Sequence, residues 1–453
     1  MRVTWTQPED LVAHELAQAR AEGADISGFT AEWIAAGGDP VPPRGGASPA
    51  RAPEARLRVA RDLLERLDRV SAAAQEPDTW EQMLRLLPPE PAALPAAGAD
   101  LDDRILAAWR GRAAACLLGK PVEKIPREGI RALLESAGRW PLTQYFSAAG
   151  VPAAVSERWP WNKVSGATSL VENIDGMPED DDLNYPLLNL ALLERHGRGF
   201  STEDVARAWL NDLPAGRVFT AERIAYRNLL DGVEPGHAGR VRNPFREWIG
   251  ALIRTDVYGW AAPGHPREAA RMAWTDARLS HTRNGVYGAM WAAALTSASL
   301  VCSGVDEVLA AGIGVIPEGS DLARAVIRGA EIGRSGRGLD AELDMLHAEF
   351  GSLHWVHTVN NAASIAYALA ASEGEFSRAA PAAVMLGWDT DSAGATVGSI
   401  AGALGGTAAL ESRWVDPLDN RIATSLPGMH NASIGSLAAR TSALAHNFLT
   451  ESK

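Results

Sequence analysis

Two short acidic segments carry the residues of this chain that could do chemistry. In the first, Asp389 and Asp391 alternate with the hydroxyl-bearing Thr390 and Ser392. The residues from there to Gly406 are almost all Ala, Gly, Val, Ile and Ser, which is typical of a helix packed closely against others. Carboxylates at the mouth of a buried helix need a compensating cation. Carboxylate and hydroxyl oxygens suit Mg²⁺, so the pattern predicts a magnesium site, with a solvated Asp-x-Asp turn as the alternative.

The second acidic segment, residues 179–182, lies far upstream and precedes an amphipathic helix. Apolar residues recur at helical spacing over residues 183–195, Pro186 fits a first turn, and Gly197 fits the stop. Acids at a helix start complement its dipole, which explains one or two of the four. A solvated acidic face is the alternative for the segment taken alone. Together with the first segment, it predicts a metal site that both share.

The chain at this point resembles the ADP-ribosylglycohydrolases. Residues 111–123 look like the glycine-rich helix that ends in a Gly-x-Pro-x-Glu segment, and residues 179–182 look like Thr-Asp-Asp-Thr. Residues 387–392 look like Gly-Gly-Asp-Thr-Asp-[Thr/Ser], and residues 279–289 resemble the Thr-His stretch ahead of a small-residue helix. The resemblance covers roughly residues 100 to 412.

The resemblance implies a helical fold with a binuclear metal site that holds two Mg²⁺ ions, or Mn²⁺ instead. The expected metal ligands are Glu179, Asp180, Asp181, Asp389, Asp391 and Ser392. The expected catalytic residues are Glu123, Asp181 and Asp389, with Glu123 in proton transfer. The expected substrate-binding residues are Ser280, His281, Trp388 and Asp182, the last also being an alternate metal ligand.

Several of these residues have plainer interpretations. Glu123, taken alone, fits an exposed loop glutamate. His281 next to Ser280 fits a helix cap or a satisfied core histidine as well as a contact to a ribose or phosphate. Trp388 stands where the family usually has glycine, and it fits a packing anchor as well as a ring that stacks on a base or sugar.

Three departures from the family pattern bear on substrate choice. Glu179 replaces the first Thr of the Thr-Asp-Asp-Thr motif, and Asp182 replaces its last Thr. Residues 115 and 116 are Ala and Cys where the family usually has Gly and Asp. An added acid near a metal should disfavour a diphosphate close by.

The reaction that the resemblance implies is hydrolysis at an anomeric carbon, which passes through an oxocarbenium-like state. The usual product would be ADP-ribose released from a modified side chain or a small acceptor. A hydrolase of smaller nucleoside-like N-glycosides is the alternative. A non-catalytic binding or structural relative is the third possibility, and the retained acids count against it.

The composition narrows the classes of partner that this protein could bind. The 453 residues carry a formal net charge of -13 without a basic patch, which counts against nucleic acid as a partner. The only cysteines, Cys116 and Cys302, fit buried thiols in a reducing cytoplasm. The N-terminus has no apolar core of a signal peptide, and the longest apolar stretch, residues 289–301, contains Thr and Ser, so we expect no membrane span. The sequence leaves the oligomeric state open.

Helical patterns dominate and strand-like alternation is scarce, which predicts a mainly α fold, an irregular or orthogonal helical bundle. Helices are expected at residues 105–118, 202–213, 221–230 and 267–277, and small-residue helices at 292–298, 362–371 and 393–404. Residues 151–161 look irregular, as in a lid or pocket rim. Pro-rich breaks at residues 39–49 and 88–95 mark a helical N-terminal extension, residues 1–98, with helices from Pro53 and over residues 80–87. Residues 99–453 form the expected catalytic domain.

Overall fold

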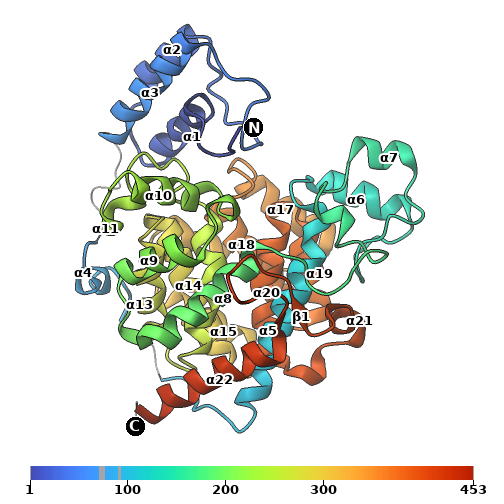
Figure 1. Cartoon of the computed structure of the whole chain (residues 1–453). Helices are drawn as coiled ribbons and strands as arrows, with labels where there is room; N and C mark the ends of the chain where they lie inside the picture. The colour runs from blue at the N-terminus through green and yellow to red at the C-terminus, as the bar shows by residue number, and fades with distance from the viewer. Residues whose placement is uncertain (1, 71–76, 90–92, 452–453) are drawn as a thin grey trace.

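The computed structural model describes residues 2–70, 77–89 and 93–451, and it is built almost entirely of helices (Figure 1). The strands named in that part of the chain form one two-stranded antiparallel sheet, β1 (Arg421–Ile422) and β2 (Ala432–Ser433), with Arg421 opposite Ser433. The predicted mainly α class is therefore confirmed. Within the described ranges, no helix is both long enough and apolar enough to cross a membrane.

The helices have the following bounds. The N-terminal ones are α1 (Pro8–Ala21), α2 (Ser27–Ala35), α3 (Glu54–Asp68) and α4 (Trp80–Leu84). Next come α5 (Leu101–Gly119), α6 (Arg127–Ser136), α7 (Ala153–Arg158), α8 (Asp181–His196), α9 (Thr202–Asp212), α10 (Thr220–Leu230), α11 (Pro235–Ala238) and α12 (Asp256–Trp260). The rest are α13 (Pro266–Ala277), α14 (Arg283–Ser299), α15 (Val305–Ile313), α16 (Asp321–Gly333), α17 (Leu339–Phe350), α18 (Thr358–Ser372), α19 (Phe376–Met385), α20 (Thr390–Gly405), α21 (Ser412–Val415) and α22 (Ile434–Glu451).

Helices α5 and α20 lie against each other in the middle of the molecule (Figure 1). Small residues make this possible. A Cβ atom built on Gly394 would lie 2.6 Å from the carbonyl oxygen of Ala115, and one built on Gly398 would clash with the carbonyl of Gly111. The expected close packing of the small-residue helix at 393–404 is confirmed, and it fixes the first turn of α20 beside the end of α5.

Helix α8 begins earlier than the sequence suggested. Asp180 is its N-cap and its carboxylate accepts a hydrogen bond from the backbone N–H of Asp182 at 2.9 Å. Pro186 consequently lies inside the helix and not in its first turn, which corrects the prediction. The helix ends at Gly197, whose φ of 63° favours glycine, as predicted.

Helices α1, α2 and α3 pack on one another at one end of the molecule (Figure 1). They are held to the rest of the chain by buried ion pairs from Arg246 to Glu15 at 3.0 Å and to Glu22 at 2.7 Å. The Trp5 ring packs edge-on against Phe245, with ring centroids 5.4 Å apart. The extension therefore covers the helical body through a specific, largely buried contact.

Two local predictions need correction. Residues 151–161, expected to be irregular, contain the short helix α7. The helix expected over residues 80–87 is shorter, α4 ending at Leu84. Of the Pro-rich segment 88–95, residues 90–92 lie outside the described residues.

Candidate active site

The N-terminal ends of α8 and α20 and the loop after α5 converge on one cavity of about 290 Å³, here called the acid pocket. Its lining includes every predicted metal ligand and the predicted proton-transfer residue: Glu123, Glu179, Asp180, Asp181, Asp389, Asp391 and Ser392. Two helix starts facing the same space also contribute the positive ends of their dipoles, which favour carboxylates there. Residues more than 200 positions apart in sequence thus share one site.

The carboxylates of the acid pocket repel one another in a poorly solvated space. Burial, and after it the charge of Asp180, raises the pKa of Asp181 well above its ordinary value. Burial and then Asp391 likewise raise the pKa of Asp389. Burial, and then Glu123, raises the pKa of Asp391 to about 7. When all of these acids are ionised, the pocket therefore needs added positive charge to offset their mutual repulsion.

Lys120 supplies part of that charge. Its ammonium group contacts Asp180 Oδ2 directly and lies 3.3 Å from the carbonyl oxygen of Glu179. Burial acts to raise the pKa of Asp180, but this ammonium group brings it below its ordinary value. Lys120 belongs to the Gly-Lys-Pro-Val-Glu segment that was singled out for Glu123, yet the sequence analysis gave it no role. Its position three residues before Glu123 in that segment was the only available hint.

Glu123 and Glu179 lie at the edges of the acid pocket and are held by neighbouring groups. Glu123 Oε2 accepts a hydrogen bond from Asn162 at 2.8 Å, and its Oε1 lies 2.9 Å from the ammonium nitrogen of Lys124. Glu179 Oε1 accepts hydrogen bonds from Asn184 and Ser425, at 2.7 and 2.6 Å. Its Oε2 lies 3.1 Å from a guanidinium nitrogen of Arg217. Both glutamates are thus fixed in place, and both oxygens of Glu179 have protein partners.

Asp182 lies below the pocket and not in its lining. It is 1% exposed, and its carboxylate accepts the hydroxyl hydrogen of Ser392 at 3.1 Å. The guanidinium group of Arg112 donates to the carbonyl oxygen of Asp182 at 2.7 Å and to Asp256 at 2.8 Å. This placement is at odds with the predicted substrate contact of Asp182, because the helix turn that exposes Asp181 directs the next residue inward.

Ser280 and His281, which were predicted to bind substrate, also lie outside the acid pocket. They are 0% and 1% exposed and do not line the acid pocket. Ser280 Oγ lies 2.8 Å from His281 Nδ1 and accepts a hydrogen bond from Arg254 at 2.9 Å. Arg254 in turn donates to Glu222 at 2.9 Å, and Glu222 does line the pocket. The pair supports the pocket from behind, which matches the plainer interpretation of His281 as a core histidine. No sequence motif pointed to Glu222.

Trp388 faces a second cavity, of about 620 Å³, here called the aromatic cavity. Its ring lies beside His347, with ring centroids 4.7 Å apart. At the bend before α20, Trp388 lines the aromatic cavity, whereas the next residue, Asp389, lines the acid pocket. Trp388 is therefore not part of the acid pocket, and the predicted stacking on a base or sugar stays a prediction. Trp355, which the sequence analysis did not single out, lines both cavities.

The chemistry of the acid pocket fits hard divalent cations. In the described part of the chain, no protein group donates a hydrogen bond to the half-buried Asp181 carboxylate, and a charged carboxylate without a partner is costly in so poorly solvated a pocket. Cys116, Asp180 and Asp182 form a tighter group, with ligand atoms within 4.8 Å of one another. However, burial raises the pKa of the Cys116 thiol well above its ordinary value, and a neutral thiol is a poor ligand for Mg²⁺. The oxygen set of the pocket is the better match.

Comparison with known proteins identifies the family and the fold of the chain. The family model for ADP-ribosylglycohydrolase matches residues 97–448. A solved structure described as an ADP-ribosylglycohydrolase-related protein complex is 22% identical, with a TM-score of 0.51, and the alignment covers 77% of this chain and 99% of that one. That similarity shows a shared fold. No curated protein matches. This family supports a glycohydrolase role. Because the family model matches most of the chain, this protein belongs to the ADP-ribosylglycohydrolase family.

Proposed function

We propose that this protein is a metal-dependent hydrolase that cleaves a ribosidic bond and releases ADP-ribose from a modified protein side chain or a small acceptor. The observation that carries the proposal is the convergence of Asp180, Asp181, Asp389 and Asp391 with Glu123 in one pocket. Hydrolysis at an anomeric carbon develops positive charge on the sugar. A pocket lined by fixed carboxylates stabilises that charge as it forms.

The residues that would hold two Mg²⁺ or Mn²⁺ ions are Asp180, Asp181, Asp389, Asp391 and Ser392, with the carboxylate of Glu179 already engaged by protein groups. Bound there, such ions position ribose hydroxyls and lower the pKa of water. Lys120, which also lines the pocket, pairs with Asp180 and offsets part of its charge. The helix starts of α8 and α20 hold the ligands rigidly because α20 is locked against α5.

Glu123 is the residue placed for proton transfer. Asn162 and Lys124 hold its two oxygens, which fixes the carboxylate at the edge of the pocket with 20% of its side chain exposed. There it can take a proton from an attacking water or return one to the leaving group. Asp181 and Asp389, on the opposing helix starts, would orient the water and the sugar.

A release assay tests the proposal. The protein is incubated with Mg²⁺ or Mn²⁺ and peptides ADP-ribosylated on arginine or serine, beside a panel of nucleosides, and released ADP-ribose or base is quantified. We expect ADP-ribose release that chelator abolishes, and that Asp389→Asn reduces by at least about a thousandfold, as for a group acting directly in the reaction.

A smaller riboside is the second candidate substrate, and one observation favours it. A volume of about 290 Å³ suits a sugar with a small leaving group better than a whole dinucleotide-sized ligand. Cleavage of nucleosides alone in the assay would replace the ADP-ribosyl proposal with this one. Inactivity on every ribosylated compound would favour a non-catalytic binding role.

A further inference from the structure

Trp5 brings the N-terminal extension into the lining of the acid pocket. It lies far upstream of residue 97, where the family match begins, so it is a feature of this chain beyond the matched region. Its backbone φ is 63°, a conformation that a bulky residue rarely adopts. Such strain persists only where the surrounding contacts hold it, and it is frequent at functional sites. The sequence analysis gave Trp5 no role.

Several contacts hold this strained residue in place. The backbone N–H of Trp5 donates to the carbonyl oxygen of Gly46 at 2.5 Å. Arg223 donates to the carbonyl oxygen and to the hydroxyl oxygen of the preceding residue, Thr4, at 2.9 and 2.6 Å. A Cβ atom on Gly46 would lie 2.6 Å from the Trp5 ring, so a side chain at position 46 would displace that ring. The ring also packs edge-on against Trp248, with centroids 5.6 Å apart. Its orientation is therefore fixed in advance of any ligand.

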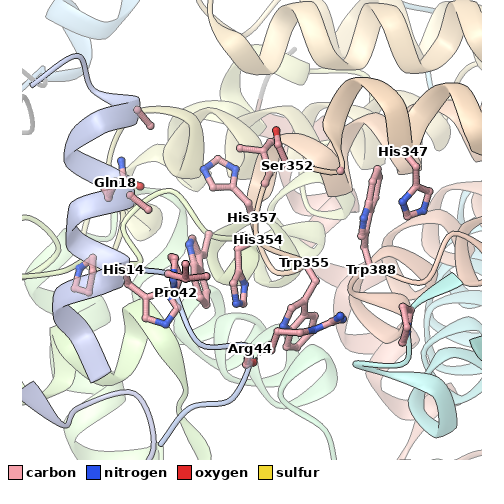
Figure 2. A pocket seen from close by; sticks show the side chains of 18 of the residues that line it. His14, Gln18, Pro42, Arg44, His347, Ser352, His354, Trp355, His357 and Trp388 are labelled. Carbon is pink, nitrogen blue, oxygen red and sulfur yellow. Dashed lines mark hydrogen bonds between the residues drawn. The ribbon is translucent and has the colours of Figure 1, made fainter. Parts of the chain in front are cut away.

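Trp5 belongs to an apolar part of the pocket lining, here called the apolar wall. Its members come from other elements than the acids do, and they are Trp5, Phe219, Ile249, Ile253, Trp355 and Val356. Phe219 is the N-cap residue of α10 and is 38% exposed. Trp355 lies beside Arg44 of the extension, with its indole nitrogen 3.4 Å from the Arg44 carbonyl oxygen (Figure 2). The extension therefore both contributes to this wall and supports it.

The rings of the apolar wall offer little to a positively charged group. The guanidinium carbon of Arg223 lies 5.1 Å from the centre of the Phe219 ring. The ammonium nitrogen of Lys124 lies 5.7 Å from the centre of the Trp355 ring. Cations of the protein thus already lie near two of the three aromatic residues of the wall. A cationic group of a ligand would meet like charges there, which disfavours it.

Glu222, in the first turn of α10, also lines the pocket, but its charge is already offset. It lies behind Gly250, where an added Cβ atom would clash with its carboxylate, and it is 3% exposed. Arg254 donates a hydrogen bond to this carboxylate at 2.9 Å. Glu222 therefore does not give the apolar wall a free carboxylate for a cation.

We propose that Trp5 is a specificity-determining residue that selects ribosides whose leaving group is uncharged and presents apolar surface. The inference rests on the proposed function, in which the sugar lies against the acids and the ions that they hold. The leaving group then meets the apolar wall. Burying a guanidinium or ammonium group there without a partner is costly, whereas a neutral ring gains contact with Trp5. Among modified side chains, the wall favours an uncharged acceptor over arginine.

Two ribosides of the same shape test the selection by charge. They are 3-methylphenyl riboside and 1-methylpyridinium-3-yl riboside, of which only the second carries a positive charge. Each is titrated calorimetrically into the full-length, Mg²⁺-loaded Glu123→Gln protein, which keeps every predicted metal ligand and lacks the proton-transfer group. We expect the neutral riboside to bind at least about tenfold more tightly, because the cationic ring has to be desolvated without a partner. Equal affinities, or tighter binding of the cationic riboside, would overturn the proposal.

Substitutions in the apolar wall test the role of Trp5 itself. In the same Glu123→Gln background, Trp5→Leu should weaken the neutral aryl riboside about fivefold more than methyl riboside, which has no ring. Phe219→Ala should act in the same direction, and truncating this half-exposed side chain leaves the packing of the extension intact. The matched controls are Trp80→Leu, on α4 of the same extension, and Leu230→Ala, at the exposed end of α10, because neither residue lines the pocket. Both controls should bind all three ribosides as the parent protein does, and unchanged affinity ratios in both wall variants would overturn the proposal.

This inference and the proposed function fail in different ways. Mg²⁺-dependent binding of methyl riboside reports on the acids alone, and its absence would overturn the proposed function together with this inference. Binding of methyl riboside without any preference between the neutral and cationic aryl ribosides would overturn the role of Trp5 and leave the glycohydrolase proposal intact. Where the Glu123-containing protein cleaves the aryl riboside, Trp5→Leu should raise KM and keep kcat within about twofold, as for the loss of a contact away from the reacting bond.

Discussion

The hydroxyl group of Ser392 donates a hydrogen bond to the carboxylate of Asp182 at 3.1 Å, and so joins two acidic segments that are 210 positions apart. Cys116 completes this corner, since its sulfur lies within 4.8 Å of ligand oxygens of Asp180 and Asp182. The sequence resembles a pattern with an acid at position 116 and a threonine at position 182. In this chain the acid is Asp182 on α8, and the small uncharged residue is Cys116 on α5. The two residue types have thus exchanged helices, and one carboxylate remains at this place.

The exchange predicts mutual rescue between positions 116 and 182. Cys116→Asp alone adds a buried carboxylate without a partner, so we expect a loss of several kcal/mol in the free energy of unfolding, about 3 or more. Adding Asp182→Thr should recover at least about 1 kcal/mol of that loss, the size of a coupling between groups in contact. Urea denaturation of the Mg²⁺-loaded proteins measures both. Cys302→Asp is the control, because Cys302 is also 0% exposed but does not belong to the group that Cys116 forms with Asp180 and Asp182, and Asp182→Thr should not rescue it. Strictly additive effects at 116 and 182 would contradict the exchange.

Metal binding should depend on the first turn of α20. Asp391→Asn keeps the shape of the side chain but removes a negative oxygen from the acid pocket. We expect the affinity for Mg²⁺ or Mn²⁺, measured by titration calorimetry on chelator-treated protein, to fall at least about tenfold. Asp306→Asn alters an exposed acid in the first turn of α15 and should change nothing. Normal metal affinity in Asp391→Asn would mean that the acids do not act as ligands.

Lys120 should contribute most to the stability of the folded protein when metal is absent. Removing one partner of a buried ion pair costs about 3–5 kcal/mol, so chelator-treated Lys120→Met should melt well below the wild type. Mg²⁺ should restore more stability to the variant than to the wild type, because Asp180 then gains a cation it lacked. Differential scanning fluorimetry with and without chelator measures both shifts. Lys163→Met, at an exposed lysine near the same rim, is the control. Equal melting temperatures for Lys120→Met and wild type in chelator would exclude a stabilising pair.

The contribution of Asp391 to the stability of the metal-free protein should fall as the pH rises. The folded structure raises the pKa of Asp391 from 3.8 to about 7, so the folded state holds a proton that the unfolded state has already released. This contribution to the free energy of unfolding therefore falls between about pH 4 and pH 7, with a limiting slope of about 1.4 kcal/mol per pH unit for each such group. Denaturation of chelated protein between pH 5 and 8 checks this. Saturating Mg²⁺ should flatten the dependence, and so should Asp391→Asn in part. Buried histidines such as His14 and His354, whose pKa values are lowered to about 3, add stability as the pH rises towards 6.5. The effect of Asp391 is therefore measured as the difference between chelated wild type and chelated Asp391→Asn, and a difference that does not change with pH would contradict the repulsion inferred for the pocket.

The sequence alone determined the helical class, the positions of several helices, among them α5, α8 and α20, and the pairing of the two acidic segments. The helix positions followed because apolar residues recur at a period that only a helix places on one face. The small residues of 393–404 predicted close packing because a larger side chain would hold the neighbouring backbone away. The acids were found because four adjacent carboxylates, and two more beside a buried helix, have few purposes other than binding a cation.

Only the tertiary structure decided which way individual side chains point and what lies opposite them. Asp181 and Asp182 are neighbours in sequence, yet the rotation of about 100° between successive helix residues places the first in the pocket and the second beneath it. Ser280 and His281 belong to a family-like segment, but Arg254 holds Ser280 in the core and His281 lies beside it. The roles of Lys120, Glu222 and Trp355, and the aromatic cavity under the extension, come from contacts between distant segments. Local patterns do not encode such contacts, because they depend on how the helices pack against one another.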